Sequence, residues 1–330
     1  MDFVKEMKAK AVSASKKLVL PEGTDKRIIR AARILMDEKI AASVTLLGSI
    51  DDIKEIADSE GIDLYGIDIV FPEAEPNIGN YSLSFYELRK NKGMTPEQAR
   101  IDIIDPLRWG AMMVHQGDAD VIVAGAENPT SEVLRAGLSI IGTVPGLKTA
   151  SSCFVMTGLD VKFGKEGAMV FSDCAVVPDP SPEQLADIAQ SAALSCREYL
   201  QVEPGVAFLS FSTKGSAKHD DVEKVLSAMK ILKERNVDFL YDGELQADTA
   251  LIPSVLDTKA PGSPVRGKVN TLIFPDLNSG NIGYKLVQRM AKANAFGPFL
   301  QGFAKPISDL SRGASVDEIV TTCAVTLARC

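Results

Sequence analysis

Short apolar runs alternate along the chain with longer stretches whose apolar residues recur at helical spacing. Residues 18–20 and 44–48 are short β-branched or Leu-rich runs, and residues 121–125 are a continuous apolar run, whereas residues 25–38 and 51–59 have the helical period. Continuous apolar runs are typical of strands buried on both faces, with the intervening helices as crossovers between parallel strands. The pattern predicts an α/β fold.

The periodicity lapses at residues 142–146, which read Gly-Thr-Val-Pro-Gly. Because glycine and proline interrupt regular structure, we expect a hinge there. Beyond it, residues 152–156 and 168–171 predict neighbouring strands joined by a glycine-containing turn, and residues 207–211 and 271–274 predict further strands.

Four loops that follow or precede predicted elements are rich in Ser, Thr, Asn and Gly: residues 21–24, 210–216, 275–281 and 309–315. In open α/β sheets ligands lie beyond the carboxyl ends of the strands, and helix N-termini there favour anions. One such loop is ordinary capping, but several in one chain indicate an anion site. The chain has neither a GxxxxGK[ST] nor a GxGxxG sequence, which argues against nucleotide hydrolysis and dinucleotide binding.

Length and net charge restrict the expected number of domains and the classes of binding partner. A chain of 330 residues is long for one hydrophobic core, so two α/β domains are expected. The formal net charge of −8 leaves no broad basic field, which argues against a nucleic-acid partner. An acidic protein that binds anions must concentrate its cations locally, so arginines beside glycine-rich loops become the candidates.

The five cysteines are widely spaced, without a CxxC pair, and the chain has only two histidines, so we expect no metal site and no disulfide framework. Their apolar surroundings predict that Cys153, Cys174, Cys196 and Cys323 are packed in the core. The N-terminal residues lack an apolar signal core, and no run of about 18 apolar residues would span a membrane. We therefore expect a cytoplasmic protein without a membrane partner.

Six segments carry a resemblance to a known family: residues 20–23, 86–95, 133–138, 259–265, 274–285 and 309–315. In this order they resemble the short, catalytic-domain-only form of phosphate acetyltransferase, within the phosphate acetyl/butyryl transferase family, over essentially the whole chain. The resemblance implies two three-layer α/β domains with an interdomain cleft, a fold similar to isopropylmalate dehydrogenase, and a homodimer. It also implies that the C-terminal helix returns to the first domain. We expect domains of residues 1–145 plus 304–330 and of residues 146–303.

The activity implied by the resemblance is reversible transfer of an acetyl group between acetyl phosphate and coenzyme A, in acetyl-CoA and acetate metabolism. Transfer is expected to be direct, in a ternary complex. Coenzyme A is a substrate here, and no cofactor is expected, because neither reactant is oxidised.

Arg312 and Ser311 lie in the last of these segments. The resemblance assigns to Arg312 the binding of acetyl phosphate and the stabilisation of charge as the acyl-phosphate bond breaks, for which a planar guanidinium is suited. Ser311 would hydrogen-bond the acyl carbonyl or help to hold the thiol, rather than act as a nucleophile, since no histidine is near in sequence. The alternatives are a surface salt bridge for Arg312 and a simple loop hydroxyl for Ser311.

Glu318 occupies the position at which the family is proposed to have its general base. The thiol of coenzyme A, if it behaves like a cysteine thiol with a pKa of about 8.5, needs such a base at neutral pH. The family usually has Asp there, whereas this chain reads Asp317-Glu318. Residues 315–318 also read as a capping box, in which Glu318 reaches back to the Ser315 amide, and a carboxylate that accepts an N–H bond is a weaker base.

The remaining candidates bind substrate. Arg89 and Arg135 resemble the arginines through which the family engages coenzyme A. The alternative for Arg89 is a solvated helix face. A second set would line the phosphate end through amide, hydroxyl and ammonium donors, with capping as the alternative for the first three: Asn278, Ser279, Asn281 and Lys285.

Three other functions remain open from sequence. The first is phosphate butyryltransferase, which differs only in the acyl pocket. The second is a non-catalytic CoA-sensing domain, against which the Ser311-Arg312 pair argues. Metal-dependent dehydrogenation of a 2-hydroxy acid is suggested by the fold alone and finds no metal or nicotinamide motif.

Overall fold

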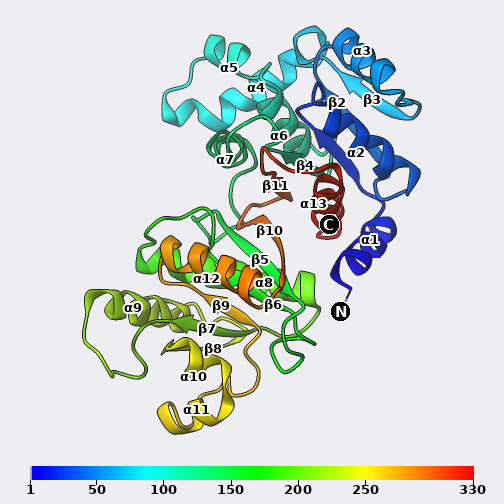
Figure 1. The fold of residues 1–330 in the computed structure, drawn as a ribbon. Coiled ribbons are helices and arrows are strands. Elements are labelled where there is room, and N and C mark those ends of the chain that lie inside the picture. The colour runs from blue at the N-terminus through cyan, green and yellow to red at the C-terminus, as the bar shows by residue number, and fades with distance from the viewer. Residues whose placement is uncertain (1) are drawn as a thin grey trace. The chain divides into compact units, whose positions relative to one another are not determined.

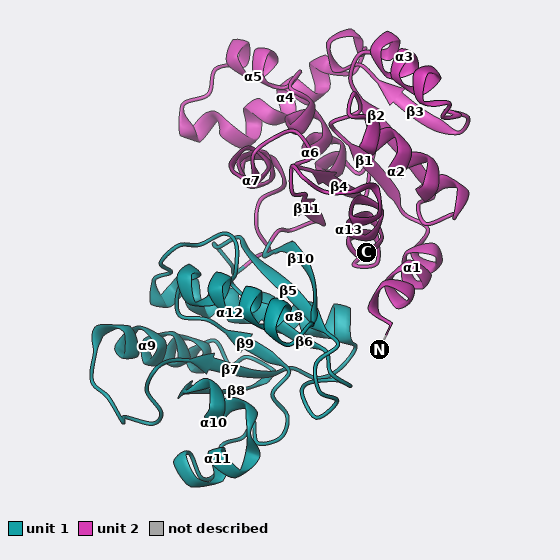
Figure 2. Cartoon of the chain, in the orientation of Figure 1, with its two compact units in different colours: residues 1, 146–302 teal, residues 2–145, 303–330 magenta. Residues whose placement is uncertain are grey.

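The computed structural model describes residues 2–330, which divide into two compact units (Figure 2). Unit 1 contains residues 146–302, and unit 2 contains residues 2–145 and 303–330. Each unit has one β-sheet of its own, so the predicted α/β class is confirmed. Within residues 2–330, no helix has the length and apolar character needed to cross a membrane.

Unit 2 is built on a five-stranded sheet in the order β11-β4-β1-β2-β3, with every neighbouring pair parallel. Its strands are β1 (Lys17–Leu20), β2 (Ser43–Leu47), β3 (Ile67–Val70), β4 (Val121–Ala124) and β11 (Ile307–Asp309). Its helices are α1 (Phe3–Ala14), α2 (Lys26–Asp37), α3 (Ile50–Glu60), α4 (Ile78–Arg89), α5 (Pro96–Asp102), α6 (Pro106–Gln116), α7 (Thr130–Ala136) and α13 (Val316–Leu327). Single turns of other helix types lie at Pro72–Ala74, Lys90–Lys92 and Gly137–Ile141.

Successive side chains along these strands point to opposite faces of the sheet, and both faces are buried. Leu18 and Leu20 share one core with the apolar stripes of α2 and α13, which pack on each other beside β4 (Figure 1). On the other face α6 approaches so closely that a side chain on Gly110 would lie 3.0 Å from Ile122. Unit 2 therefore has three layers, and the C-terminal segment contributes an edge strand and a covering helix to a sheet begun by the N-terminal segment.

Unit 1 is built on a six-stranded sheet in the order β10-β5-β6-β9-β7-β8. Its strands are β5 (Ser151–Thr157), β6 (Met169–Ser172), β7 (Gly205–Leu209), β8 (Leu240–Leu245), β9 (Thr271–Ile273) and β10 (Asn294–Gln301). Its helices are α8 (Pro182–Leu200), α9 (Asp220–Glu234), α10 (Ala247–Leu251), α11 (Pro253–Lys259) and α12 (Leu277–Met290). β6, β9, β7 and β8 are parallel, whereas β5 and β10 run antiparallel to their neighbours.

The expected strands are present with small differences at their ends. The predicted strand over residues 207–211 begins at Gly205 and ends at Leu209. Beyond Leu209 the Ser210 hydroxyl accepts from the Ser212 amide and the Ser212 hydroxyl donates to Glu244, which are contacts of the following loop. The antiparallel pairing of β5 with β6 agrees with the glycine-containing turn predicted between them.

Candidate active site

Three loops meet at the carboxyl edge of the unit 2 sheet. They follow β1, β4 and β11, which are adjacent parallel strands, and they lead into α2, α7 and α13. Carboxyl ends of parallel strands lie at one edge of a sheet, so the three loops and the N-termini of three helices converge there. Two of the loops were singled out from the sequence, namely residues 21–24 and 309–315.

Glu22 holds the loop after β4. Its carboxylate is only 4% exposed and accepts bonds from the backbone amides of Gly125, Ala126 and Glu127 at 2.7–3.1 Å. It also accepts from both the backbone and the side-chain nitrogen of Asn128 at 2.9 Å. A buried carboxylate needs this many donors to offset its desolvation, and in return the donors fix the loop backbone.

Asp309 joins the loop after β11 to the first turn of α7. Its Oδ2 accepts a 2.5 Å bond from the hydroxyl of Thr130, whereas its buried Oδ1 has no hydrogen-bond partner within residues 2–330. Burial, together with the nearby Glu22 carboxylate, raises the pKa of Asp309 to about 6 although the Thr130 bond opposes the rise. Gly125 has φ +111°, and a Cβ there would lie 2.4 Å from Asp309 Oδ1, so the approach of the two loops requires glycine.

Arg27, in the first turn of α2, ties all three loops together. Its Nη1 donates to the carbonyl oxygens of Arg312 at 2.8 Å and Ala314 at 3.0 Å. Its Nη2 donates to the carbonyl oxygen of Ala126 at 3.0 Å and to Asp25 Oδ2 at 2.5 Å. The hydrogen bond with Asp25 is the main cause that raises the pKa of Arg27, so the guanidinium stays charged.

Ser311 and Arg312 lie in the exposed part of the loop after β11. Ser311 Oγ accepts a bond from the Gly313 amide at 3.3 Å, which leaves its own hydrogen to donate. In the described part of the chain no carboxylate pairs with the Arg312 guanidinium, so the surface salt bridge considered from sequence is absent there. An unpaired guanidinium beside converging helix N-termini has the charge and donors to bind a phosphate.

Glu318 forms the capping box foreseen in the sequence. Its Oε2 accepts from the Ser315 amide at 2.8 Å and the Ser315 hydroxyl at 2.9 Å, while Ser315 Oγ accepts from the Glu318 amide at 3.3 Å. Within residues 2–330, all the hydrogen bonds made by this carboxylate are to Oε2. Capping thus leaves Oε1 able to accept a proton, and the two roles considered for Glu318 are compatible.

Arg135 and Arg89 lie on other elements of unit 2. Arg135 is in the last turn of α7 with an exposed side chain, and it pairs with Glu132 at 2.9 Å. Arg89 is the last residue of α4 and is half-buried. α4 packs against α6 and against the turn at Gly137–Ile141, which continues directly from α7. The substrate roles of both arginines stay predictions.

The other four candidates belong to α12 of unit 1. Asp276 caps this helix by accepting from the Ser279 amide at 2.8 Å, so the alternative that Asn278, Ser279 or Asn281 is the cap is wrong. The Ser279 hydroxyl donates to the Asp276 carbonyl, and Asn281 Nδ2 donates to the Cys174 carbonyl at 3.1 Å.

Asn278 and Lys285 are exposed, and Lys285 Nζ lies 5.8 Å from the centre of the Tyr284 ring. Binding of substrate by these four residues stays a prediction.

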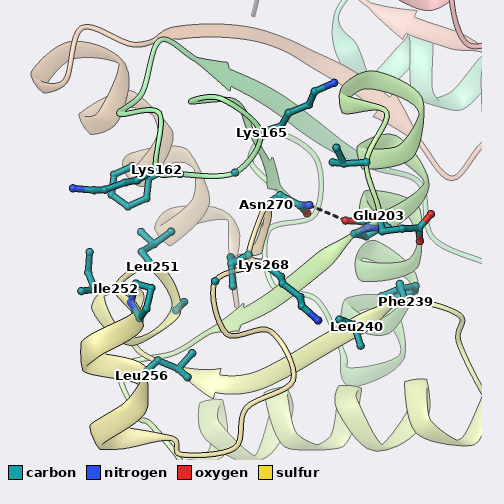
Figure 3. A pocket seen from close by; sticks show the side chains of 18 of the residues that line it. Lys162, Lys165, Glu203, Phe239, Leu240, Leu251, Ile252, Leu256, Lys268 and Asn270 are labelled. Atoms are coloured by element: carbon teal, nitrogen blue, oxygen red, sulfur yellow. Dashed lines mark hydrogen bonds between the residues drawn. The ribbon is translucent and has the colours of Figure 1, made fainter.

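A cavity of about 1090 Å³ lies elsewhere in unit 1 (Figure 3). Leu251, Ile252 and Leu256 line one side, and Lys268 and Asn270 precede β9. The dashed bond in Figure 3 runs from Asn270 Nδ2 to the Glu203 carbonyl oxygen at 2.8 Å. The cavity borders the amino ends of β7, β8 and β9, opposite to the edge at which α/β sheets bind ligands, and no predicted site residue lines it.

Sequence reasoning missed Glu22, Arg27 and Asp309. The segments that contain Glu22 and Asp309 were recognised, but neither residue was given a role, and Arg27 was not singled out. The available signal was an acidic residue at the carboxyl end of a buried strand, since Asp309 is the last residue of β11 and Glu22 lies two residues after β1. Among residues 2–330 no group of three His, Cys, Asp or Glu side chains is placed to hold a metal ion.

A serine and an arginine at the sheet edge where three helices begin are typical of a protein that binds anions. Comparison with known proteins specifies the class. The profile of the phosphate acetyl/butaryl transferase family matches residues 2–327. The chain therefore belongs to this family, whose members are acyltransferases.

Individual relatives support the same family assignment. A protein of Treponema pallidum named phosphate acetyltransferase is 56% identical over 330 residues, which cover 99% of this chain and 98% of the relative. The crystal structure of a phosphotransacetylase from Streptococcus pyogenes superposes with a TM-score of 0.92 at 38% identity, covering 99% of this chain and 97% of the other. A 4-hydroxythreonine-4-phosphate dehydrogenase from Klebsiella pneumoniae shares only the fold, with a TM-score of 0.54 and 12% identity over 95% of this chain and 99% of its own. Specific likeness to isopropylmalate dehydrogenase stays a prediction.

Proposed function

We propose that this chain is a phosphate acetyltransferase, which moves an acetyl group between acetyl phosphate and the thiol of coenzyme A. The full-length similarity to proteins of that name supports the assignment. The observation that carries it at the level of residues is the unpaired Arg312 guanidinium on a loop fixed at the carboxyl edge of the unit 2 sheet. Such a group can pair with the phosphate of acetyl phosphate, and with the free phosphate that the reaction releases.

In the proposed mechanism Arg312 binds the phosphate of acetyl phosphate and Ser311 donates a hydrogen bond to the acyl carbonyl. Glu318 Oε1 accepts the proton of the thiol, and the thiolate sulfur attacks the carbonyl carbon. The sulfur–carbon bond forms, the carbon–oxygen bond to phosphate breaks, and phosphate leaves while still paired with Arg312. Orientation and charge stabilisation supply most of the rate, since no covalent enzyme intermediate is needed.

The acyl preference is tested by assaying thioester formation from coenzyme A with acetyl phosphate and butyryl phosphate in parallel. We expect acetyl phosphate to have the higher kcat/KM by at least tenfold, which is the effect of a few misplaced methylene groups in an acyl pocket. Equal or greater activity with butyryl phosphate would assign the chain to the butyryl branch of the family. No turnover of either acyl phosphate would support the non-catalytic alternative.

We further propose a homodimer located in the cytoplasm. The homodimer rests on the family resemblance, and light scattering of the purified protein tests it through a molecular mass of about twice 35.4 kDa. The cytoplasmic location is supported by the free, buried thiols of Cys174, Cys196 and Cys323 within residues 2–330. Fractionation of the source cells tests it.

A further inference from the structure

The active-site loop after β11 has few restraints of its own. Leu310 is held by a 2.7 Å bond from its amide to the Ala124 carbonyl, and Ser315 is held in the capping box. Between them, residues 311–313 are exposed, and a 2.9 Å bond from the Ala314 amide to the Ser311 carbonyl closes the turn. Among the hydrogen bonds of the described residues, Arg27 is the one side chain from another element that binds this segment.

Every donor of the Arg27 guanidinium is occupied. A guanidinium has five N–H groups. The single hydrogen on Nε lies between the two Asp25 carboxylate oxygens, each at 3.1 Å. The two on Nη1 bind the Arg312 and Ala314 carbonyls, and the two on Nη2 bind Asp25 and the Ala126 carbonyl. Arg27 therefore has no donor left for substrate, which separates its role from that of Arg312.

Asp25 fixes Arg27 in turn. It is the N-cap of α2, where its Oδ1 accepts from the Arg27 amide at 2.7 Å. Burial alone would raise the pKa of Asp25, but the hydrogen bonds from Arg27 outweigh it and lower the pKa. Asp25 is thus a carboxylate at neutral pH, and the Asp25–Arg27 pair is a rigid fork anchored on a helix N-terminus.

We propose that Arg27 is a positioning residue for Arg312: by binding the backbone carbonyls of Arg312 and Ala314 and that of Ala126, it sets the direction in which the Arg312 guanidinium extends. The inference rests on the proposed role of Arg312 in binding the phosphate. It extends the account of that role. Because no side chain within residues 2–330 pairs with the Arg312 guanidinium, the backbone of the loop sets its direction, and Arg27 holds that backbone. Only a planar fork reaches three carbonyls on two loops at once, so the geometry of the group matters as well as its charge.

The first test is Arg27→Lys, which keeps the positive charge but loses the fork. We expect kcat/KM for acetyl phosphate to fall about 10- to 100-fold, the effect of displacing a catalytic group by about 1 Å. The KM for coenzyme A should change less than about twofold, since the arginines proposed to bind it lie on α4 and α7.

The matched control is Arg33→Lys on the same helix. Arg33 also binds two backbone carbonyls, those of Asp63 and Tyr65, but away from the three loops, and its substitution should leave kcat/KM near wild type. Wild-type kcat/KM in Arg27→Lys would overturn the inference.

A double-mutant cycle separates positioning from a general structural effect. If Arg27 acts through Arg312, adding Arg27→Lys to Arg312→Ala should lower kcat/KM less than about twofold further. Two fully additive losses would overturn the inference while leaving the role of Arg312 intact. An Arg312→Ala enzyme with wild-type activity would instead overturn the proposed role of Arg312, and this inference with it.

Fluorescence of Trp109, the chain's single tryptophan, buried in unit 2, checks that each variant is folded. If Arg27→Lys does not fold, Asp25→Asn replaces it in the same cycle. That variant retains a cap acceptor but loses the carboxylate that orients Arg27. We expect the same fall in kcat/KM for acetyl phosphate, and less than about a twofold further fall when it is combined with Arg312→Ala.

Discussion

Glu318→Gln separates the two roles that the structure allows for this residue. The capping box uses Oε2 alone, through bonds of 2.8 and 2.9 Å from Ser315. A glutamine retains an acceptor oxygen of the same reach, and Gln is accepted at this position of a capping box. It cannot take up a proton as a carboxylate does. The substitution therefore preserves the helix start and removes the proposed base.

The expected sizes of the two effects differ widely. Loss of one negative charge in the first turn of α13 costs about 0.5 kcal/mol of stability, because the carboxylate is exposed and its interaction with the helix dipole is screened. Loss of a general base lowers the rate about 100-fold or more. Turnover should thus collapse while the fold is almost unchanged.

Two measurements on the same preparation test this prediction. Urea unfolding followed by Trp109 fluorescence reports on unit 2, which contains α13, and the release of thiol from acetyl-CoA and phosphate reports turnover. Asp317→Asn is the matched control, since Asp317 is an exposed carboxylate in the same first turn of α13. It should lose a similar stability and retain activity. Wild-type turnover in Glu318→Gln, above all if Asp317→Asn is inactive, would refute the reasoning.

Two further predictions concern Asp309 and its contact with Gly125. The pKa of Asp309 is raised by burial from 3.8 to about 6, so its favourable contribution is present at low pH and is lost as pH rises through about 6. As pH rises from 4.5 to 7.5, the unfolding free energy of Asp309→Asn should therefore increase by about 2 kcal/mol relative to that of wild type. Urea unfolding followed by Trp109 fluorescence measures this difference, and a difference that does not change with pH would be inconsistent with the account. In the same assay the free energy of unfolding of Gly125→Ala should be lower by on the order of 2–3 kcal/mol, because alanine is strained at φ +111° and its Cβ would clash with Asp309 and Leu310. An unchanged urea midpoint would exclude that explanation.

Local patterns in the sequence predicted most elements of the fold. The apolar runs became β1, β2 and β4, and the helix predicted to begin at Asp25 begins at Lys26 with Asp25 as its cap. These features depend on neighbours along the chain, for which periodicity and capping chemistry are informative. The capping box at Ser315 is a further case, because its two partners are three residues apart.

Contacts between distant segments could not be predicted in the same way. Glu22 and Gly125 are 103 positions apart, and Arg27 and Arg312 are 285 apart. Such contacts depend on the strand order β11-β4-β1, which brings the end of the chain beside its beginning and leaves no periodic signal. The resemblance indicated which loops matter, but only the structure shows that buried carboxylates and one arginine hold them in place.

The central claim is that the Arg312 guanidinium binds the phosphate during acyl transfer. It is tested most directly by the steady-state rate of thiol release from acetyl-CoA and phosphate by Arg312→Ala, with the exposed Arg100 of α5 changed to alanine as the control. We predict at least a 100-fold fall in kcat/KM for phosphate, since one preorganised charge contact is worth roughly 3 kcal/mol, and wild-type behaviour for Arg100→Ala. A folded Arg312→Ala enzyme whose kcat/KM lies within about threefold of wild type would contradict the claim.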